Sequence, residues 1–380
     1  MTGLLAVLRS RRVVGLSTLV WLELLFAFCA VSVISRLANA PDLLSEGATS
    51  ASLRFTAPIL LAGIGALWAE RSGVINIGLE GAMITGTWFG AWAGFTFGPE
   101  MGVAVAVLSG VVFGLVLAIL AVGFGVDQAV AGLALNLLAA GLTRYLSSLY
   151  FDGVGTGSIT QSPQVPSLPV VSLPGADVLL GPLADADVLV LSDAAGVLLG
   201  LTTNVSVLTI LAFATIPVTA WVLFRTRLGL RIRFAGEAPS AEDALGVNPN
   251  LHRFIALAVS GGLGALGGAY LVLVASSIYS EGQTAGRGFI GMATVIFGNW
   301  MPGRTGLGAY LFGFTDALGT RQEATVNALL IAGGLLLFVL TLVRLRRRRD
   351  RRTTVYAGLA TKPTERIIVI VDNYTAATIP

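Results

Sequence analysis

Charged residues inside apolar segments are the first candidates for chemistry in this sequence. A charge in membrane hydrocarbon is costly, so such residues usually face a cavity or a partner and often mark a pathway for solutes or ions. Five of them interrupt or border long apolar stretches of the chain: Glu23, Glu80, Asp127, Arg144 and Asp316. Asp127 and Arg144 lie near the ends of their stretches, which leaves few buried charges for a proton- or ion-coupled carrier.

Glu80 lies in the stretch SGVINIGLEGAM (72–83), where Asn76 adds a polar amide and Gly78 and Gly81 add flexibility. This pattern predicts a broken or re-entrant helix, whose free backbone donors and acceptors would face a cavity. Two readings of Glu80 stay open. Its carboxylate could contact a solute, or it could cap the broken helix.

A second stretch, 285–318, has a similar pattern, because a charged residue and glycines again precede a short apolar helix. Transporters use internal repeats of this kind to build a site near the middle of the membrane. The sequence therefore favours an internal repeat, in which each half contains a charged residue and glycines before a short apolar helix.

Nucleotide hydrolysis by this chain is excluded by its lysine content. A P-loop needs a lysine before Ser or Thr to neutralise phosphates, and the single lysine, Lys362, is followed by Pro363. One Cys (Cys29) and one His (His252) also argue against a disulfide framework and a His-rich metal centre. We predict a chain that is not an enzyme and holds no cofactor or metal, so ATP and Mg²⁺ would be used by a partner.

The composition is that of an integral membrane protein. Of 380 residues, 55% are hydrophobic and only 12% charged, with a mean hydropathy of +0.82. Seven of the 23 arginines fall between Arg344 and Arg352, so the net charge of +3 is a local cluster and indicates no nucleic-acid partner.

Long apolar segments predict an all-α, polytopic membrane bundle of about ten transmembrane helices, with eight to eleven allowed. The two shortest, 55–69 and 286–300, are expected to be interrupted segments. Successive G-x-x-x-G steps, such as Gly110/Gly114, predict close helix packing. The predicted segments are 13–34, 55–69, 77–97, 101–122, 128–148, 205–224, 254–275, 286–300, 303–319 and 325–343.

The first of these segments has an alternative, because Ala38-Asn39-Ala40 resembles a signal-peptidase site. The apolar run 13–34 is long enough to span, which favours a retained helix. Ten crossings place the basic regions 225–253 and 344–352 on the same side as residues 1–12, in agreement with the positive-inside rule. We therefore expect both termini to be cytoplasmic in a multi-pass cell-membrane protein.

This topology divides the chain into a cytoplasmic N-terminus (1–12), a transmembrane domain (13–343) and a basic cytoplasmic tail (344–380). Within the domain, 150–204 is expected to be an external loop rich in Gly, Pro, Ser and Asp. Its apolar patches are too short to span and are expected to lie on the membrane surface or fold over the bundle.

The polar region 225–253 is expected to contain one very short helix. Its start is assigned either to Ser240, with Asp243 completing a capping box, or to Pro239 in the first turn. Gly246 is placed as its C-terminal stop. Three apolar residues then share one face and must pack against something, since so short a helix is marginal alone: Ala241, Ala244 and Leu245.

Three stretches together resemble the permease subunits of bacterial and archaeal ABC importers, in the branched-chain amino acid and simple-sugar permease family. They are AERSGVINIGLEGAM (69–83), RTRLGLRIRFAGEAPSAEDALGV (225–247) and GRGFIGMATVIFGNWMPGRTGLGAYLFGFTDAL (286–318). The first is most similar to the subgroup associated with nucleosides and a basic-membrane-lipoprotein-type binding protein. The resemblance covers roughly 50–345.

This resemblance implies four partners: an ABC ATPase subunit, a second permease subunit in a heterodimer, an extracytoplasmic solute-binding protein, and membrane lipids. It also implies that 236–246 forms the coupling helix that docks into the ATPase. Ala238-Pro239 departs from the asparagine-proline pattern of the family. The coupling residues carried over are Gly236, Glu237, Ala241, Glu242, Asp243, Ala244, Leu245 and Gly246.

The sequence thus predicts a permease that moves a small polar solute inward by alternating access, a nucleoside or otherwise a simple sugar. From position alone, the solute pathway is assigned to Asn76, Glu80, Phe289 and Asn299. A core or lipid-facing role is the alternative for Phe289. An autonomous secondary transporter or channel is the alternative function, and a membrane scaffold without transport is a third.

Overall fold

The computed structural model describes residues 12–13, 16–17, 28–29, 31–33, 35–36, 44–186, 188 and 190–319. Several predictions lie outside these residues: Glu23, most of the 13–34 segment, the Ala38–Ala40 site, the 325–343 segment and the 344–380 tail. The chain divides into two units, residues 1–40 with 323–380 and residues 41–322, and each is described by itself.

The first unit contains one short antiparallel pair, β1 (Arg12–Val13) with β2 (Leu16–Ser17). A helix from Val13 onward was expected, and this is wrong for three residues of the pair: Val13, Leu16 and Ser17.

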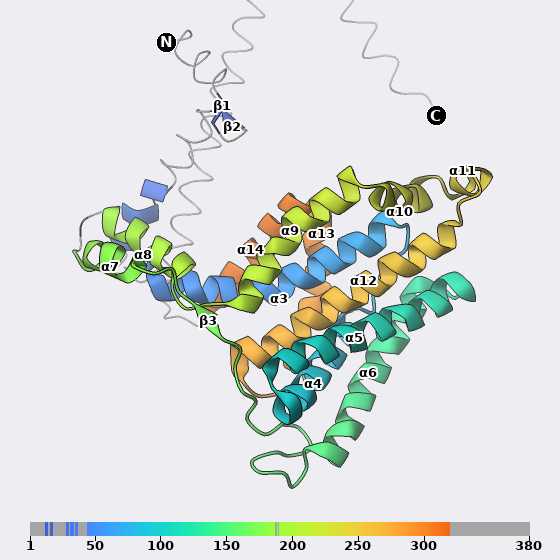
Figure 1. The fold of residues 1–380 in the computed structure, drawn as a ribbon, viewed down its shortest axis with the longest axis horizontal. Coiled ribbons are helices and arrows are strands. Elements are labelled where there is room, and N and C mark those ends of the chain that lie inside the picture. The colour runs from blue at the N-terminus through green and yellow to red at the C-terminus, as the bar shows by residue number, and fades with distance from the viewer. Residues whose placement is uncertain are drawn as a thin grey trace, which may run out of the picture. The chain divides into compact units, whose positions relative to one another are not determined.

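The second unit is mostly helical (Figure 1). Its first half contains four long helices. Helix α3 (Glu46–Arg71) begins at Ser45, whose hydroxyl accepts the N–H of Ala48 at 3.2 Å. It is followed by α4 (Leu79–Phe97), α5 (Pro99–Ala118) with a π-helical end, η2 (Ile119–Gly123), and α6 (Gln128–Tyr150). Asp127 caps α6 by accepting two backbone N–H groups, as its place near a span end suggested.

The segment after α6 carries a two-stranded pair and a helical hairpin. Strand β3 (Val170–Val171) pairs with β4 (Val205–Ser206), and between them lie α7 (Ala176–Asp185) and α8 (Leu191–Thr202). Helix α8 packs on the start of α3, because Gly196 and Gly200 bring its backbone against the residues around Glu46. Three large apolar residues of α7 are exposed: Val178, Leu179 and Leu183.

The second half of the unit begins with α9 (Val207–Arg225), α10 (Arg227–Glu237) and α11 (Pro239–Ala244). Then come α12 (Pro249–Tyr270) with its π-helical end η3 (Leu271–Ser276), α13 (Arg287–Phe297) and α14 (Pro302–Gly319). In Figure 1, α10 and α11 lie at one end of the bundle, which we call the α11 end. The other end, with β3 and β4, is called the β4 end.

Five helices of the described chain are long and apolar enough to cross a membrane: α3, α5 with η2, α6, α9, and α12 with η3. At 1.5 Å per residue, the 11 residues of α13 extend only about 16 Å, roughly half of a hydrocarbon core of about 30 Å. The short segment expected at 286–300 is therefore confirmed. The short segment expected at 55–69 is wrong, because the polar turns after Ser45 extend it into the 26-residue α3.

Close helix packing through glycine is confirmed at the centre of the bundle. Helix α12 packs against α3, α4 and α5. A Cβ atom on Gly110 or Gly114 of α5 would collide with the backbone of α12, and one on Gly268 of α12 would collide with α4. Small residues therefore allow backbones to touch where no hydrophobic effect drives helices together in lipid.

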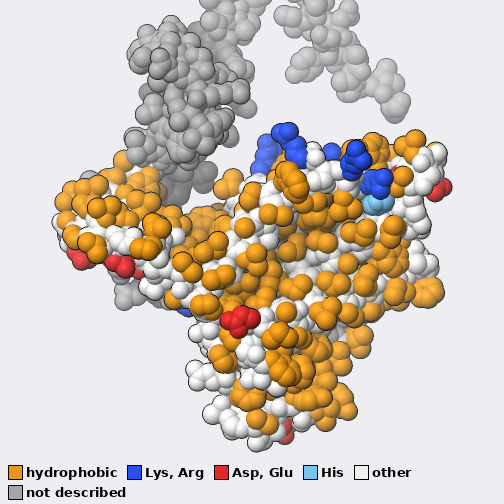
Figure 2. All heavy atoms as spheres, in the orientation of Figure 1, with side chains coloured by type: hydrophobic (Ala, Val, Ile, Leu, Met, Phe, Trp, Pro, Cys, Tyr) orange, Lys and Arg blue, Asp and Glu red, His pale blue; other side chains and the backbone are white. Residues whose placement is uncertain are grey.

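The surface view shows hydrophobic side chains over most of the face in sight, with Lys and Arg side chains gathered at the rim (Figure 2). Large apolar side chains of α5 and α6 are exposed, among them Leu108, Val130 and Leu137. Together with the spans, this supports a multi-pass membrane protein.

Candidate solute pathway and coupling surface

The backbone is interrupted twice beside long helices. Residues 72–78 follow α3 and lead into α4 at Gly78, and residues 277–286 follow η3 and lead into α13 at Gly286. Gly286 has φ 77°, a left-handed conformation that favours glycine. The interruption predicted within 72–83 is therefore confirmed for residues 72–78, whereas 79–83 already belong to α4, and a second interruption precedes α13.

Glu80 joins the two interruptions. Its side chain is buried, and its Oε1 and Oε2 atoms accept the backbone N–H groups of Gly286 at 3.0 Å and Gly288 at 2.8 Å. These N–H groups lie at the N-terminus of α13. The first N–H groups of a helix have no acceptor within that helix, and the N-terminus carries a partial positive charge. Glu80 therefore caps a helix, as one reading expected, but the capped helix is α13 rather than its own.

The first turn of α4 is held from the side by Asn136 of α6. Its Oδ1 accepts the N–H of Gly81 at 2.7 Å and its Nδ2 donates to the carbonyl of Ile77 at 3.0 Å. One amide side chain thus satisfies both a donor and an acceptor left by the interruption. Sequence reasoning missed Asn136, although a polar residue in the apolar 128–148 segment could have drawn attention to it.

Asn76 lies in the first interruption and is 1% exposed. Its Nδ2 donates to the hydroxyl of Ser260 on α12 at 2.9 Å. Within the described chain its buried Oδ1 atom has no hydrogen-bond partner, so it has an acceptor to spare.

The four predicted pathway residues do not gather at one point. Asn76 and Glu80 are buried near the meeting of α4 and α13, and Phe289 lies in the first turn of α13 with 40% of its side chain exposed. Asn299 lies beyond the other end of α13 and is exposed, with φ 49°. Because α13 is about 16 Å long, Asn299 and Glu80 cannot contact one small solute together.

Two more of the five charged residues singled out in the sequence, Asp316 and Arg144, form ion pairs with α13 or with the interruption that precedes it. Arg287, at the start of α13, donates to the carboxylate of Asp316 on α14 at 2.7 Å. Arg144 of α6 lies 3.4 Å from Glu281, in the 277–286 segment. These side chains tie the second interruption to α6 and α14.

A cavity of about 820 Å³ opens at the β4 end, between the start of α3, the β3–β4 pair and η3. Its lining combines charged and hydroxyl groups with apolar side chains. The polar members include Glu46, Ser50, Arg54, Thr203, Asn204 and Thr209, and the apolar ones include Phe55 and Leu271. A lining of this mixture suits a small polar solute with one apolar face.

At the α11 end, the short helix differs in part from its prediction. Pro239 occupies the first turn, whereas the alternative start at Ser240 is wrong, since Ala238 is the N-cap and no side chain caps the helix. Gly246 follows the C-cap with φ 75°, as expected for a stop. Helix α10 was missed, because its three arginines (Arg227, Arg231 and Arg233) made it part of the polar region in which only one short helix was expected.

The three apolar residues of α11 face outward. Ala241 and Ala244 are exposed, and the side chain of Leu245 is 82% exposed. Within the described chain this face is uncovered, so the packing expected for it is not seen there. Asp243 is exposed beside them.

Glu242 points the other way. Its side chain is 4% exposed and lies 3.1 Å from Nδ1 of His252 in α12. His252 also contacts the carbonyl of Asn248 through the same atom. Glu242 therefore faces α12 and the buried His252 rather than the outside of the molecule, although neither of its carboxylate oxygens accepts a hydrogen bond within the described chain.

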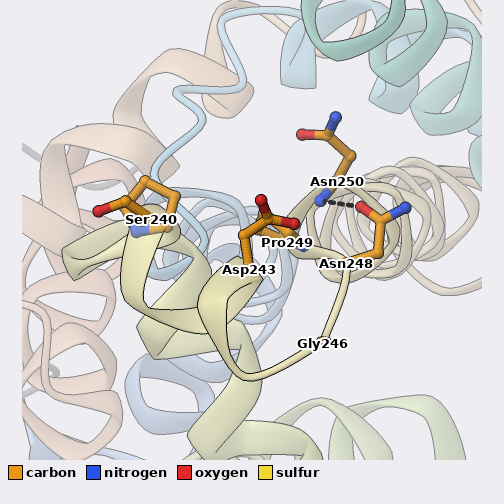
Figure 3. Close-up of a pocket in the computed structure, with 7 residues that line it drawn as sticks. Ser240, Asp243, Gly246, Asn248, Pro249 and Asn250 are labelled. Atoms are coloured by element: carbon orange, nitrogen blue, oxygen red, sulfur yellow. Dashed lines mark hydrogen bonds between the residues drawn. The ribbon is translucent and has the colours of Figure 1, made fainter.

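A shallow pocket of about 490 Å³ separates α11 from the start of α12 (Figure 3). Asp243 extends into it, and Asn248 closes one side by accepting the N–H of Asn250 at 2.9 Å. The pocket and the apolar face of α11 together form what we call the docking surface: Ser240, Ala241, Asp243, Ala244, Leu245 and Asn250.

Comparison with known proteins gives one family. Residues 48–340 match the family described as "Branched-chain amino acid transport system / permease component". This match covers most of the chain, including both interruptions and the docking surface.

Individual relatives agree with this match. The chain is 34% identical to the "Putative glucose ABC transporter permease protein TsgC13" of Haloferax volcanii, over 75% of this chain and 80% of that protein. It is 34% identical to the "Guanosine ABC transporter permease protein NupQ" of Bacillus subtilis, over 70% and 80%. It is 32% identical to the "Nucleoside ABC transporter permease protein NupC" of Lactococcus lactis, again over 70% and 80%. No solved structure matches the chain.

Proposed function

This chain belongs to the branched-chain amino acid transport permease family, and from that premise we propose that it is the membrane-spanning subunit of an ABC importer for nucleosides. Two relatives named for guanosine or nucleosides support this solute. The relative named for glucose keeps a simple sugar as the second candidate. The chain is a transport subunit rather than an enzyme.

The observation that carries the proposal is the meeting of two interrupted segments at one buried carboxylate. Helix α13 is about half as long as a membrane is deep, and its N-terminus meets the carboxylate of Glu80. Transporters place their solute sites at such breaks, because free backbone groups there can bind a polar solute. The similar arrangement of 72–78 with α4 and 277–286 with α13 supports an internal repeat in a bundle of about ten spans.

The proposed pathway begins at the cavity of the β4 end and passes the Glu80 region. Asn76 has a spare acceptor for a base edge or ribose hydroxyl, and Phe289 has an exposed ring that can stack on a base. Glu80 acts by positioning α13. Asn299 lies at the other end of α13, and in this proposal it does not contact the solute.

Energy for transport would come from a separate ATPase that uses ATP and Mg²⁺ and binds the docking surface. The exposed apolar face of α11 and the adjacent pocket support this assignment. The coupling role also extends to Gly236 and Glu237 at the end of α10 and to Gly246. Glu242 would act indirectly, because its buried side chain faces α12 and not the ATPase. Both termini and the α11 end would lie in the cytoplasm.

The assembly would also include a second permease and an extracytoplasmic solute-binding protein that delivers solute at the β4 end. The names of the relatives as ABC transporter permeases support these partners. Co-purification of the chain with each candidate partner from native membranes tests them.

The decisive experiment is uptake of labelled guanosine by proteoliposomes that contain the whole complex. We expect ATP-dependent import of guanosine that glucose in large excess does not inhibit. ATP-dependent import of glucose with no import of guanosine would instead assign the chain to sugars.

The alternative of an autonomous carrier makes the opposite prediction in the same assay. This chain reconstituted without any ATPase should then take up guanosine in response to an ion gradient. We expect no such uptake, because few charged groups lie within the spans.

A further inference from the structure

Arg253, in the first turns of α12, connects the ATPase-facing helices to the first interruption. Its Nη2 atom donates to the carbonyl of Ala235 in α10 at 2.9 Å. Its Nε atom donates to the carbonyl of Ser72, where α3 ends and the 72–78 segment begins, at 3.3 Å. A single guanidinium therefore holds both backbones in a fixed geometry.

The two backbones also touch directly at this point. Gly73 has φ 82°, and a Cβ atom built on it would lie 2.9 Å from Cα of Gly236. With no side chain between them, a displacement of the end of α10 must move residues 72–73 as well. Packed cores and interfaces pass on such shifts because they are poorly compressible.

Arg71 makes a second connection, from the end of α3 to both α10 and α13. Its Nη1 atom lies 3.9 Å from the carboxylate of Glu237, and its Nη2 atom donates to the carbonyl of Trp300 beyond α13. Trp300 also binds α3 directly, because its Nε1 donates to the carboxylate of Glu70. The C-terminal end of α13 is thus attached to the α11 end of α3.

These contacts complete a closed chain of connections. From α10, Arg253 leads to residues 72–78, and that segment leads into α4 and Glu80. Glu80 holds the N-terminus of α13, and Trp300 ties its other end back to Arg71 and α10. Both ends of the half-length helix are therefore linked to the helices beside the docking surface.

We propose that Arg253 and Arg71 are positioning residues that transmit ATPase-driven movement of α10 and α11 to the 72–78 segment and α13. This inference rests on the proposed function. The two arginine side chains would then couple ATP hydrolysis to the opening of the pathway.

The test measures guanosine imported and ATP hydrolysed in the same proteoliposomes containing the whole complex. In Arg253→Gln and Arg71→Gln we expect the ratio of guanosine to ATP to fall at least about fivefold. Arg253→Lys retains a donor but cannot reproduce the two-pronged geometry, so its ratio should be intermediate. The matched control is Arg304→Gln, which removes an exposed arginine at the start of α14 and should leave the ratio unchanged.

A second readout separates transmission from simple loosening of the fold. Hydrogen exchange of the 72–78 backbone should differ between the ATP and ADP states of the wild-type complex, and this difference should vanish in Arg253→Gln. A wild-type ratio, or a preserved exchange difference, would overturn the inference. So would failure of all three variants to retain the ATPase on purification, because the arginines would then be needed only for assembly.

The wild-type complex distinguishes this inference from the proposed function. If wild type imports neither guanosine nor glucose with ATP, the proposed function fails. If wild type imports solute and the arginine variants remain fully coupled, only the transmission by Arg253 and Arg71 fails.

Discussion

Both carboxylate oxygens of Glu80 accept N–H groups of α13, and this geometry predicts how substitutions there behave. Glu80→Gln replaces one acceptor by an amide donor that faces an N–H group. We expect a loss of about 2 kcal/mol in this contact, since hydrogen bonds to charged groups are worth about 1.5–3 kcal/mol. Guanosine import by the complex should fall at least about tenfold.

The control for Glu80 is Glu100→Gln, which removes an exposed carboxylate from the first turn of α5. Import should stay at the wild-type level in this variant. Normal import by Glu80→Gln would show that the cap on α13 is dispensable for transport.

Asn299 gives a second prediction for a single residue. Its φ of 49° is left-handed, a conformation that costs an ordinary L residue about 1–2 kcal/mol and glycine almost nothing. Asn299→Gly should therefore keep full import, and Asn299→Val should lower the thermal stability of the purified chain. A selective loss of import in Asn299→Gly would instead show that the amide contacts solute.

Sequence reasoning located part of this site and missed its geometry. The glycines and the carboxylate of 72–83 were enough to predict an interruption around Glu80. The partner of that carboxylate was out of reach, because Gly286 and Gly288 are about 200 residues away and offer only backbone N–H groups. Every residue except proline has a backbone N–H group, so the residue type does not reveal which of these groups binds a carboxylate.

Helix α11 is the element whose role is most directly testable. Its Leu245 side chain is 82% exposed, and burial of a leucine in a partner groove is worth about 1.5–3 kcal/mol. Leu245→Asp should lower ATPase retention at least about tenfold and abolish solute-stimulated hydrolysis, with normal membrane insertion. Stimulated hydrolysis at the wild-type rate would contradict the docking assignment.

The neighbouring acidic pair provides the matched comparison. Asp243→Asn changes an exposed charge and should alter the salt dependence of ATPase binding. Glu242→Gln changes a buried partner of His252 and should lower the thermal stability of the chain without altering that salt dependence. Equal effects of the two variants would contradict the opposite orientations of these side chains.

The elements show why sequence patterns were partly sufficient. Apolar runs predicted where each long helix of the described chain lies, because each such helix contains a long and mostly hydrophobic stretch. The polar start of α3 and the arginine-rich α10 were missed, since both are helices whose residues resemble a linker. Their helical state depends on packing against α8 and α12.

The topology of the whole chain can be checked by cysteine labelling in intact cells, with Cys29 first replaced. A cysteine at Gly155, in the exposed segment after α6, should react with an impermeant reagent added outside. A cysteine at Ser240 should react only after the membrane is opened. Reaction of Ser240→Cys from outside would reverse the proposed orientation.

The glycine contacts of α12 with α4 and α5 have a consequence for how this sequence can diverge. Residues such as Gly110, Gly114 and Gly268 leave no room for even one methyl group, because the neighbouring helix backbone occupies that space. They bind nothing and carry no charge. Yet in a library of all single substitutions they should tolerate fewer replacements than the exposed solute-facing or partner-facing side chains, so the strictest selection would act where there is no side chain at all.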